Sequence, residues 1–168
     1  MAQRTKQQSE IYLRNFIFGV EDSLVSTVGL LAGVAEAGSS RGVILVTGMV
    51  YIVVEAFSMA VGSFLSEHSI EEYEGDAKSV SRSIIGASTM FLSFVIAGLI
   101  PLFPYLVLSL QTGFFLSIIV SLLALLLLGI LNAQFSNKSW IYKSIEMVVI
   151  GGAAIAIGLV AGKLFRIA

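Results

Sequence analysis

The chain has 168 residues, of which 57% are hydrophobic and 12% are charged. A soluble domain usually carries roughly 25% charged residues, so this composition excludes a soluble globular protein and indicates a protein that lies in a lipid bilayer. The net charge of −1 excludes a nucleic-acid binder that neutralises phosphates. With no cysteine and one histidine, the chain also lacks the residues for disulfides, for a thiolate site or for a multi-histidine zinc site.

Apolar stretches of about 20 residues, the length needed to cross a bilayer as a helix, occur five times. They cover residues 16–37, 43–65, 84–103, 112–132 and 144–165. The polar intervals between them include an acidic loop at 66–82 and a break around Pro101 and Pro104. The sequence therefore predicts an all-α integral membrane protein, with residues 1–168 forming one transmembrane domain of five helices and no cleaved signal peptide.

The lysines and arginines predict how the chain is oriented. Seven of them lie on one side of the membrane, before the first span, between spans two and three, or between spans four and five: Arg4, Lys6, Arg14, Lys78, Arg82, Lys138 and Lys143. Three lie on the opposite side: Arg41, Lys163 and Arg166. Because positive loops stay in the cytosol, the N-terminus is expected in the cytosol and the C-terminus outside. The expected location is the plasma membrane of a prokaryote, or the vacuolar membrane if the host is a eukaryote.

Three acidic residues lie inside the predicted spans, where a charge costs roughly 2.5–3.5 kcal/mol at the bilayer centre. They are Glu21 and Asp22 in the first span and Glu55 in the second. Such residues usually mark an ion or substrate pathway, and the alternative is a buried hydrogen-bonding role without transport. Glu36 and Glu146 lie at the ends of spans, where solvated helix termini are expected.

The spacing of these acids predicts polar faces on two helices. Asp22, Ser26, Gly29 and Gly33 recur with helical periodicity on the first span, and Tyr51, Glu55, Met59 and Gly62 do so on the second. At about 1.5 Å per residue, Asp22 and Met59 are expected at the same depth on adjacent antiparallel helices. A carboxylate and a thioether at one level favour a divalent cation of intermediate softness, although a methionine at helical spacing is more often a packing residue.

Beyond the second span, the loop is rich in acidic residues. It holds Glu67, His68, Glu71, Glu72 and Glu74, and several of them share a face if the helix continues into the loop. One interpretation is a solvated acidic turn, and the other is a patch that collects metal ions at the entrance of a pathway. In the fifth span, Gly158 and Gly162 form a GxxxG motif, which predicts helix packing within or between subunits.

Motifs for nucleotide-driven or enzymatic chemistry are absent from the sequence. It contains no Walker loop, nucleophile constellation or dinucleotide fingerprint. We therefore expect that the protein is neither driven by ATP nor an enzyme, and that it has no permanently bound cofactor.

Several segments, in order along the chain, resemble the vacuolar iron transporter family. Residues 19–34 read GVEDSLVSTVGLLAGV and resemble its first-helix signature, and residues 55–66 read EAFSMAVGSFLS and are similar to its second-helix segment. The resemblance continues at residues 98–105, which read GLIPLFPY, at residues 124–135, and at residues 145–152, which read IEMVVIGG. It covers nearly the whole chain.

The resemblance implies a five-helix homodimer that exports ferrous iron and related divalent metals, Mn²⁺ among them, from the cytosol in exchange for protons. It places Asp22 and Met59 at the positions that contribute to the family's ion path between subunits. The chain departs from the family in lacking a sizeable insertion between the second and third helices. It also has Tyr51 where a deeper acid is expected and Ser63 where many members have glutamate.

These observations lead to three hypotheses about function. The first is a proton-coupled exporter of Fe²⁺ or Mn²⁺, in which metal and proton compete for Asp22 and Glu55. The second is a structural or accessory membrane protein whose acids only stabilise helix packing, and the third is a proton-coupled exporter of organic cations. A divalent ion usually takes four to six ligands, so one subunit leaves the site underfilled. We therefore expect a homodimer in which Asp22, Glu55 and Met59 contribute twice, with Glu21 and Ser26 nearby and with Gly29 and Gly33 letting the two first helices approach.

Overall fold

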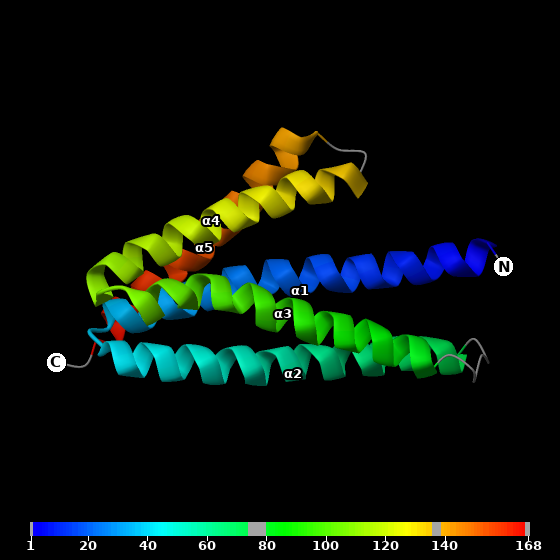
Figure 1. The fold of residues 1–168 in the computed structure, drawn as a ribbon, viewed down its shortest axis with the longest axis horizontal. Coiled ribbons are helices and arrows are strands. Elements are labelled where there is room, and N and C mark those ends of the chain that lie inside the picture. The colour runs from blue at the N-terminus through cyan, green and yellow to red at the C-terminus, as the bar shows by residue number, and fades with distance from the viewer. Residues whose placement is uncertain (1, 74–79, 136–138, 167–168) are drawn as a thin grey trace.

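The computed structural model of this chain is a bundle of five helices (Figure 1). It describes residues 2–73, 80–135 and 139–166, with side chains from Ile11 onward and without that of Glu71. In chain order the helices are α1 (Ala2–Glu36), α2 (Arg41–Tyr73), α3 (Val80–Val107), α4 (Leu110–Phe135) and α5 (Trp140–Leu164). All five are long and apolar enough to cross a membrane, which confirms the predicted fold class. α1 begins at one end of the bundle and α5 finishes at the other, as an odd number of crossings requires.

The helices are longer than the spans predicted from hydropathy. α2 continues to Tyr73 and α3 begins at Val80, so the described part of the predicted 66–82 loop is helical. The break predicted around Pro101 and Pro104 is wrong, because both prolines lie buried inside α3. Prolines are tolerated in membrane helices where neighbouring helices surround them. Here the Ser117 hydroxyl of α4 donates a 2.6 Å hydrogen bond to the Pro101 carbonyl oxygen and so joins α4 to α3 beside the prolines.

Helix α1 is the central element of the bundle, because it packs against all four other helices. On one side α2 and α3 pack against it, and on the other side α4 and α5 form an antiparallel pair (Figure 1). One apolar cluster joins α1, α2 and α3 and contains Leu31, Ile44, Ile52, Leu102 and Tyr105. A second joins α1, α3, α4 and α5 and contains Leu24, Ala97, Leu125 and Met147. Both are almost fully buried.

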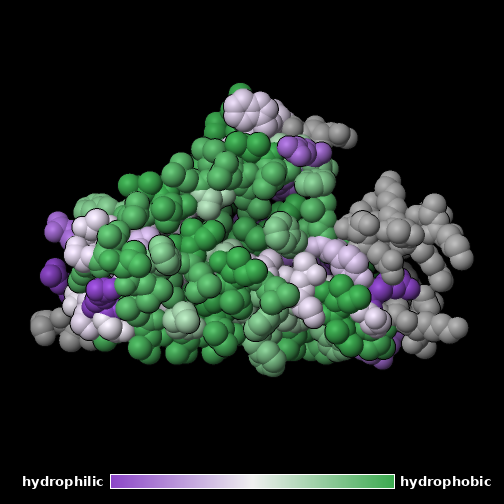
Figure 2. Space-filling model, viewed as in Figure 1, coloured by the Kyte–Doolittle hydropathy of each residue, from purple (hydrophilic) through white to green (hydrophobic). Residues whose placement is uncertain are grey.

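The outer surface of the bundle is apolar. Large hydrophobic side chains are exposed along α2 in particular, with Val46 at 65% and Phe57 at 64%. Figure 2 shows hydrophobic residues over the middle of the molecule and hydrophilic residues gathered at its two ends. In water such a surface would drive aggregation, whereas in a bilayer it faces lipid chains. The protein is therefore an integral membrane protein.

Glycines bring α1 and α5 into backbone contact. A Cβ atom on Gly33 of α1 would lie 2.7 Å from the carbonyl oxygen of Gly158, and one on Gly162 would lie 2.2 Å from that of Gly33. A Cβ on Gly29 would lie 3.0 Å from the Ala154 carbonyl oxygen. Small residues allow this approach, and van der Waals packing of this kind holds membrane helices together. The close approach permitted by Gly29 and Gly33 is thus to α5 of the same chain, where the sequence predicted an approach to α1 of a second subunit.

Candidate functional site

Two carboxyl groups from different helices are brought together inside the bundle. Asp22 lies on α1 and Glu55 on α2, both are half-buried, and the two interact electrostatically. α1 and α2 pack against each other, and their antiparallel course places these positions on the same stretch of the contact. The arrangement concentrates negative charge within the apolar zone, where charge is costly unless a cation or a proton compensates it. We call Asp22 and Glu55 the carboxylate pair.

Two hydroxyl groups adjoin the carboxylate pair. Ser26 lies one turn along α1 from Asp22, and its Oγ donates a 2.5 Å hydrogen bond to the Asp22 carbonyl oxygen, a common bond for serine within helices. The Tyr51 side chain of α2 lies close enough to the Ser26 side chain and to both acids to interact with them electrostatically. Helical spacing placed Tyr51 on the same face of the second span as Glu55 and Met59, but Tyr51 was not among the predicted site residues.

Met59 lies one turn beyond Glu55 on α2 and is half-buried. Because residues four apart share a helical face, its thioether is on the side of α2 that carries Glu55. Residues 2–73, 80–135 and 139–166 contain no cluster of three or more His, Cys, Asp or Glu side chains able to hold a metal ion. One chain thus offers a carboxylate pair, two hydroxyls and a thioether, which is an incomplete set of strong ligands for a divalent ion.

Glu21 belongs to a different contact from its neighbour Asp22. Its carboxylate interacts electrostatically with Glu146 and Lys143 of α5. The Lys143 ammonium donates a 2.7 Å hydrogen bond to Glu146 Oε2, and both side chains are partly buried. Two carboxylates and one ammonium therefore meet where α1 packs on α5. Glu21 thus interacts with charged groups of α5 as well as with its neighbour Asp22. Glu146, which was predicted to be a solvated helix terminus, is instead paired with Lys143.

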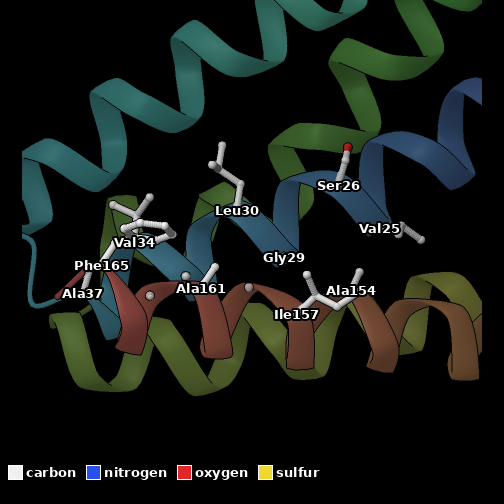
Figure 3. A pocket seen from close by; sticks show the side chains of 13 residues that line it. Val25, Ser26, Gly29, Leu30, Val34, Ala37, Ala154, Ile157, Ala161 and Phe165 are labelled. Atoms are coloured by element: carbon white, nitrogen blue, oxygen red, sulfur yellow. The ribbon is translucent and has the colours of Figure 1, made fainter.

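A surface groove of about 480 Å³ runs between α1 and α5. Ser26, Gly29 and Gly33 contribute to its α1 wall, and Ala154, Gly158 and Gly162 to its α5 wall (Figure 3). The remaining lining residues are Val25, Leu30, Val34, Ala37, Ile157, Ala161 and Phe165. The lining contains no carboxylate and one hydroxyl, that of Ser26. The small-residue face predicted from Asp22 to Gly33 thus leads from the carboxylate pair into an apolar groove.

The predicted metal-collecting residues do not form one exposed patch. Glu67 is buried at 6% exposure and accepts a 2.7 Å hydrogen bond from Asn15 Nδ2. His68 stacks on Phe64 with ring centroids 5.5 Å apart, and its Nε2 lies 3.4 Å from Glu72 Oε1. Glu72 is exposed, while the side chain of Glu71 and the whole of Glu74 lie outside the described residues. Asn15, which sequence reasoning did not single out, is the partner that holds Glu67 in the interior.

Comparison with known proteins agrees with the resemblance seen in the sequence. The model of the VIT family matches residues 13–86 and 76–163. A vacuolar iron transporter of Centaurea cyanus is 22% identical over 205 residues, covering 86% of this chain and 84% of the relative. Vacuolar iron transporter homolog 4 of Arabidopsis thaliana is 28% identical over 157 residues, covering 84% and 77%.

The length of one alignment shows that a relative has residues that this chain lacks. The alignment with the Centaurea protein is longer than this whole chain, so that relative carries residues with no counterpart here. The two segments matched by the family model overlap at residues 76–86, a range that begins after α2 and extends into the start of α3. Both observations agree with the predicted absence of an insertion between the second and third helices. Since the family model matches nearly the whole chain in the order of its five helices, this protein belongs to the VIT family.

Proposed function

We propose that this protein transports divalent metal ions across a membrane and that the carboxylate pair of Asp22 and Glu55 is its ion-binding centre. The observation that carries the proposal is the meeting of two acidic side chains from α1 and α2 within spans long enough to cross the bilayer. Two relatives that cover most of the chain are named vacuolar iron transporters or homologs of them. Carboxylates inside a membrane generally mark ion pathways.

The ligand types favour Fe²⁺ or Mn²⁺ as the transported ion. Asp22 and Glu55 supply hard oxygen ligands, and the Met59 thioether, one turn from Glu55, adds affinity for a softer first-row ion. An organic cation would instead require a roomy aromatic site beside the acids. The groove nearest to them is lined mainly by aliphatic and small residues, with Phe165 as its one aromatic side chain.

Proton coupling follows from the electrostatics of the proposed centre. Two neighbouring carboxylates in an apolar environment repel each other unless a cation neutralises them. A divalent metal or protons fulfil that role in turn, so binding of one displaces the other. With the N-terminus in the cytosol, as the positive-inside rule predicts, the protein would export metal from the cytosol in exchange for protons.

A homodimer completes the proposed centre. One chain contributes an incomplete ligand set, and a two-fold axis beside α1 and α2 would supply Asp22, Glu55 and Met59 twice. The apolar groove between α1 and α5 begins at Ser26 on the same helix and leaves part of α1 uncovered within one chain. This partly uncovered α1 surface is consistent with an axis close to α1.

The decisive experiment is metal-stimulated proton flux in proteoliposomes that contain the purified protein. A pH-sensitive dye inside the vesicles should report proton movement when Fe²⁺ or Mn²⁺ is added, and it should report none in protein-free vesicles. Metal uptake without proton movement would refute the coupling but keep metal transport. Proton flux elicited only by organic cations, or no flux with any of these ions, would support one of the two alternative functions instead.

A further inference from the structure

A buried carboxylate joins α1 and α2 at the end of the bundle where α1 begins. Glu67 Oε1 accepts a 2.7 Å hydrogen bond from Asn15 Nδ2 of α1, and both side chains are buried, at 6% and 2% exposure. The Ser63 hydroxyl lies 3.0 Å from Asn15 Nδ2 and 3.3 Å from Glu67 Oε1. Arg14 adds a charged contact, with its Nη2 3.5 Å from Glu67 Oε1. We call these four residues the Glu67 clamp.

Gly86 of α3 packs directly against the Glu67 clamp. A Cβ atom on Gly86 would lie 2.5 Å from Glu67 Oε2 and 2.8 Å from Asn15 Nδ2. Any larger residue at this position would therefore displace both polar side chains. The clamp thus holds α1 and α2 by hydrogen bonds and touches the backbone of α3, so that three helices converge on one carboxylate.

The clamp lies on the same two helices as the carboxylate pair. Along α2, Ser63 is one turn from Met59, and Met59 is one turn from Glu55. Along α1, Asn15 is two turns from Asp22, or about 10 Å at 1.5 Å per residue. The clamp therefore lies between this end of the α1–α2 contact and the carboxylate pair.

The burial of Glu67 changes its expected role. A residue that collects ions needs an exposed carboxylate, whereas Glu67 is buried and its Oε1 atom contacts Asn15 of α1 and Ser63 of α2. Hydrogen bonds to a charged group are strong, and in a buried position they are costly to break. We propose that Glu67 is a positioning residue whose clamp holds the ends of α1, α2 and α3 together and so restricts access to the Asp22–Glu55 centre. The role of the Asp22–Glu55 centre rests on the function proposed above. That the clamp holds the helix ends together does not depend on that function.

Accessibility of a single cysteine tests closure independently of transport. The natural chain has no cysteine, so Met59→Cys introduces a unique thiol between the clamp and Glu55. The rate of its modification by a hydrophilic methanethiosulfonate reagent is measured on the full chain in nanodiscs, where both faces are accessible. In the Glu67→Ala and Gly86→Ala backgrounds this rate should rise about tenfold, equivalent to about 1.4 kcal/mol in the opening equilibrium. Gly86→Ala keeps the Glu67 charge, so it remains informative if Glu67→Ala fails to fold.

Matched controls separate the clamp from general loosening of the bundle. Gly62→Ala on α2 is the control for Gly86→Ala, because a Cβ there would meet nothing within 4 Å. A cysteine at Tyr73, which is 93% exposed, should be modified at the same fast rate in every background. Equal modification of Met59→Cys with and without the clamp would overturn the proposal.

Transport by the cysteine-free protein gives the second readout. Glu67→Ala and Gly86→Ala should change the maximal rate of metal flux and leave the half-saturating metal concentration within about twofold, since the clamp acts on opening rather than on binding. Glu36→Gln removes a charge at the far end of α1, away from the clamp, and serves as the control. A Glu67→Gln variant that raises only the half-saturating concentration would instead identify Glu67 as a collecting ligand. If neither the natural chain nor any variant transports metal, but the cysteine result is as expected, the proposed role of the clamp is supported and the proposed transport function is refuted.

Discussion

Gly158 on α5 lies so close to Gly29 on α1 that a Cβ atom on Gly158 would be 2.0 Å from the Gly29 carbonyl oxygen. The obstacle is backbone, which cannot rotate away as the end of a side chain can. The contact therefore fixes how closely the central helix and the last helix approach, and with it the groove that both helices line.

Gly158→Ala should destabilise the protein by forcing α1 and α5 apart. Overpacking of this kind typically costs about 1–3 kcal/mol, and a protein of this size then loses roughly 2–4 °C of Tm for each kcal/mol. Thermal unfolding in detergent, followed by size-exclusion chromatography of a fluorescent fusion, measures the shift. Gly152→Ala on the same helix is the control, because its Cβ would meet nothing within 4 Å. An equal Tm for the two variants would show that the contact is looser than described.

Asp22→Asn should abolish metal-stimulated proton flux while the protein remains folded. The substitution preserves the size of the side chain but removes one of the two charges of the carboxylate pair, so a divalent ion loses a principal ligand. Flux in proteoliposomes and the size-exclusion profile are measured together. Glu36→Gln, at the end of α1, is the matched control and should retain transport. Full flux by Asp22→Asn would remove Asp22 from the ion path.

Tyr51→Phe should lower the rate of transport without unfolding the bundle. Only the hydroxyl is lost, and with it a polar group that interacts with Ser26 and with both acids of the carboxylate pair. We expect a decrease of about tenfold, in the range for the loss of one polar interaction near a charged group. Initial rates of Mn²⁺ uptake provide the measurement, with Tyr142→Phe, an exposed tyrosine of α5, as the control. An unchanged rate would limit Tyr51 to a packing role.

Lys143→Met should destabilise the contact of α1 with α5. Without the ammonium, Glu146 and Glu21 repel each other with no compensating charge. Because Glu146 is 35% exposed, solvent screens part of this repulsion and the expected loss is about 1 kcal/mol or less. The double variant Lys143→Met/Glu21→Gln should recover much of the lost Tm. No recovery would indicate that Lys143 stabilises by packing of its methylene groups rather than by charge.

A cysteine introduced at Ser26 should cross-link two subunits in a membrane preparation. Ser26 is adjacent to the carboxylate pair and lines the groove, so a two-fold axis near α1 would bring its two copies together. Oxidation followed by non-reducing electrophoresis should show a dimer band. Ile96→Cys on α3, whose side chain is 66% exposed on another helix, should yield no such band. Cross-linking at Ile96 and not at Ser26 would place the axis elsewhere.

Much of the fold could be predicted because hydropathy and helix length are local properties. A helix must cover about 30 Å of hydrocarbon and must satisfy its own backbone hydrogen bonds, so a run of apolar residues predicts a helix whatever lies beside it. The prolines of α3 are the exception. Whether a proline ends a helix depends on its tertiary surroundings, and here Pro101 and Pro104 are buried and Ser117 of another helix donates a hydrogen bond to the backbone at Pro101.

The candidate site was predictable only in part. Helical spacing placed Asp22 and Ser26 on one face of α1, and Glu55 and Met59 on one face of α2. The same spacing says nothing about which helix each face meets. It therefore did not pair Tyr51 of α2 with Ser26 of α1, and it did not relate Glu21 to Lys143 and Glu146 of α5.

By itself the sequence determined that this protein is a five-helix membrane protein of the VIT family with acidic residues inside its spans. Only the tertiary structure decided that Glu67 is buried beneath Gly86 and bound by Asn15, and that Gly29 and Gly33 pack on α5 of the same chain. Periodicity determines which side chains share a helical face. The partner of that face depends on how the helices cross, and a glycine or a small polar side chain on a distant helix determines how closely they do so.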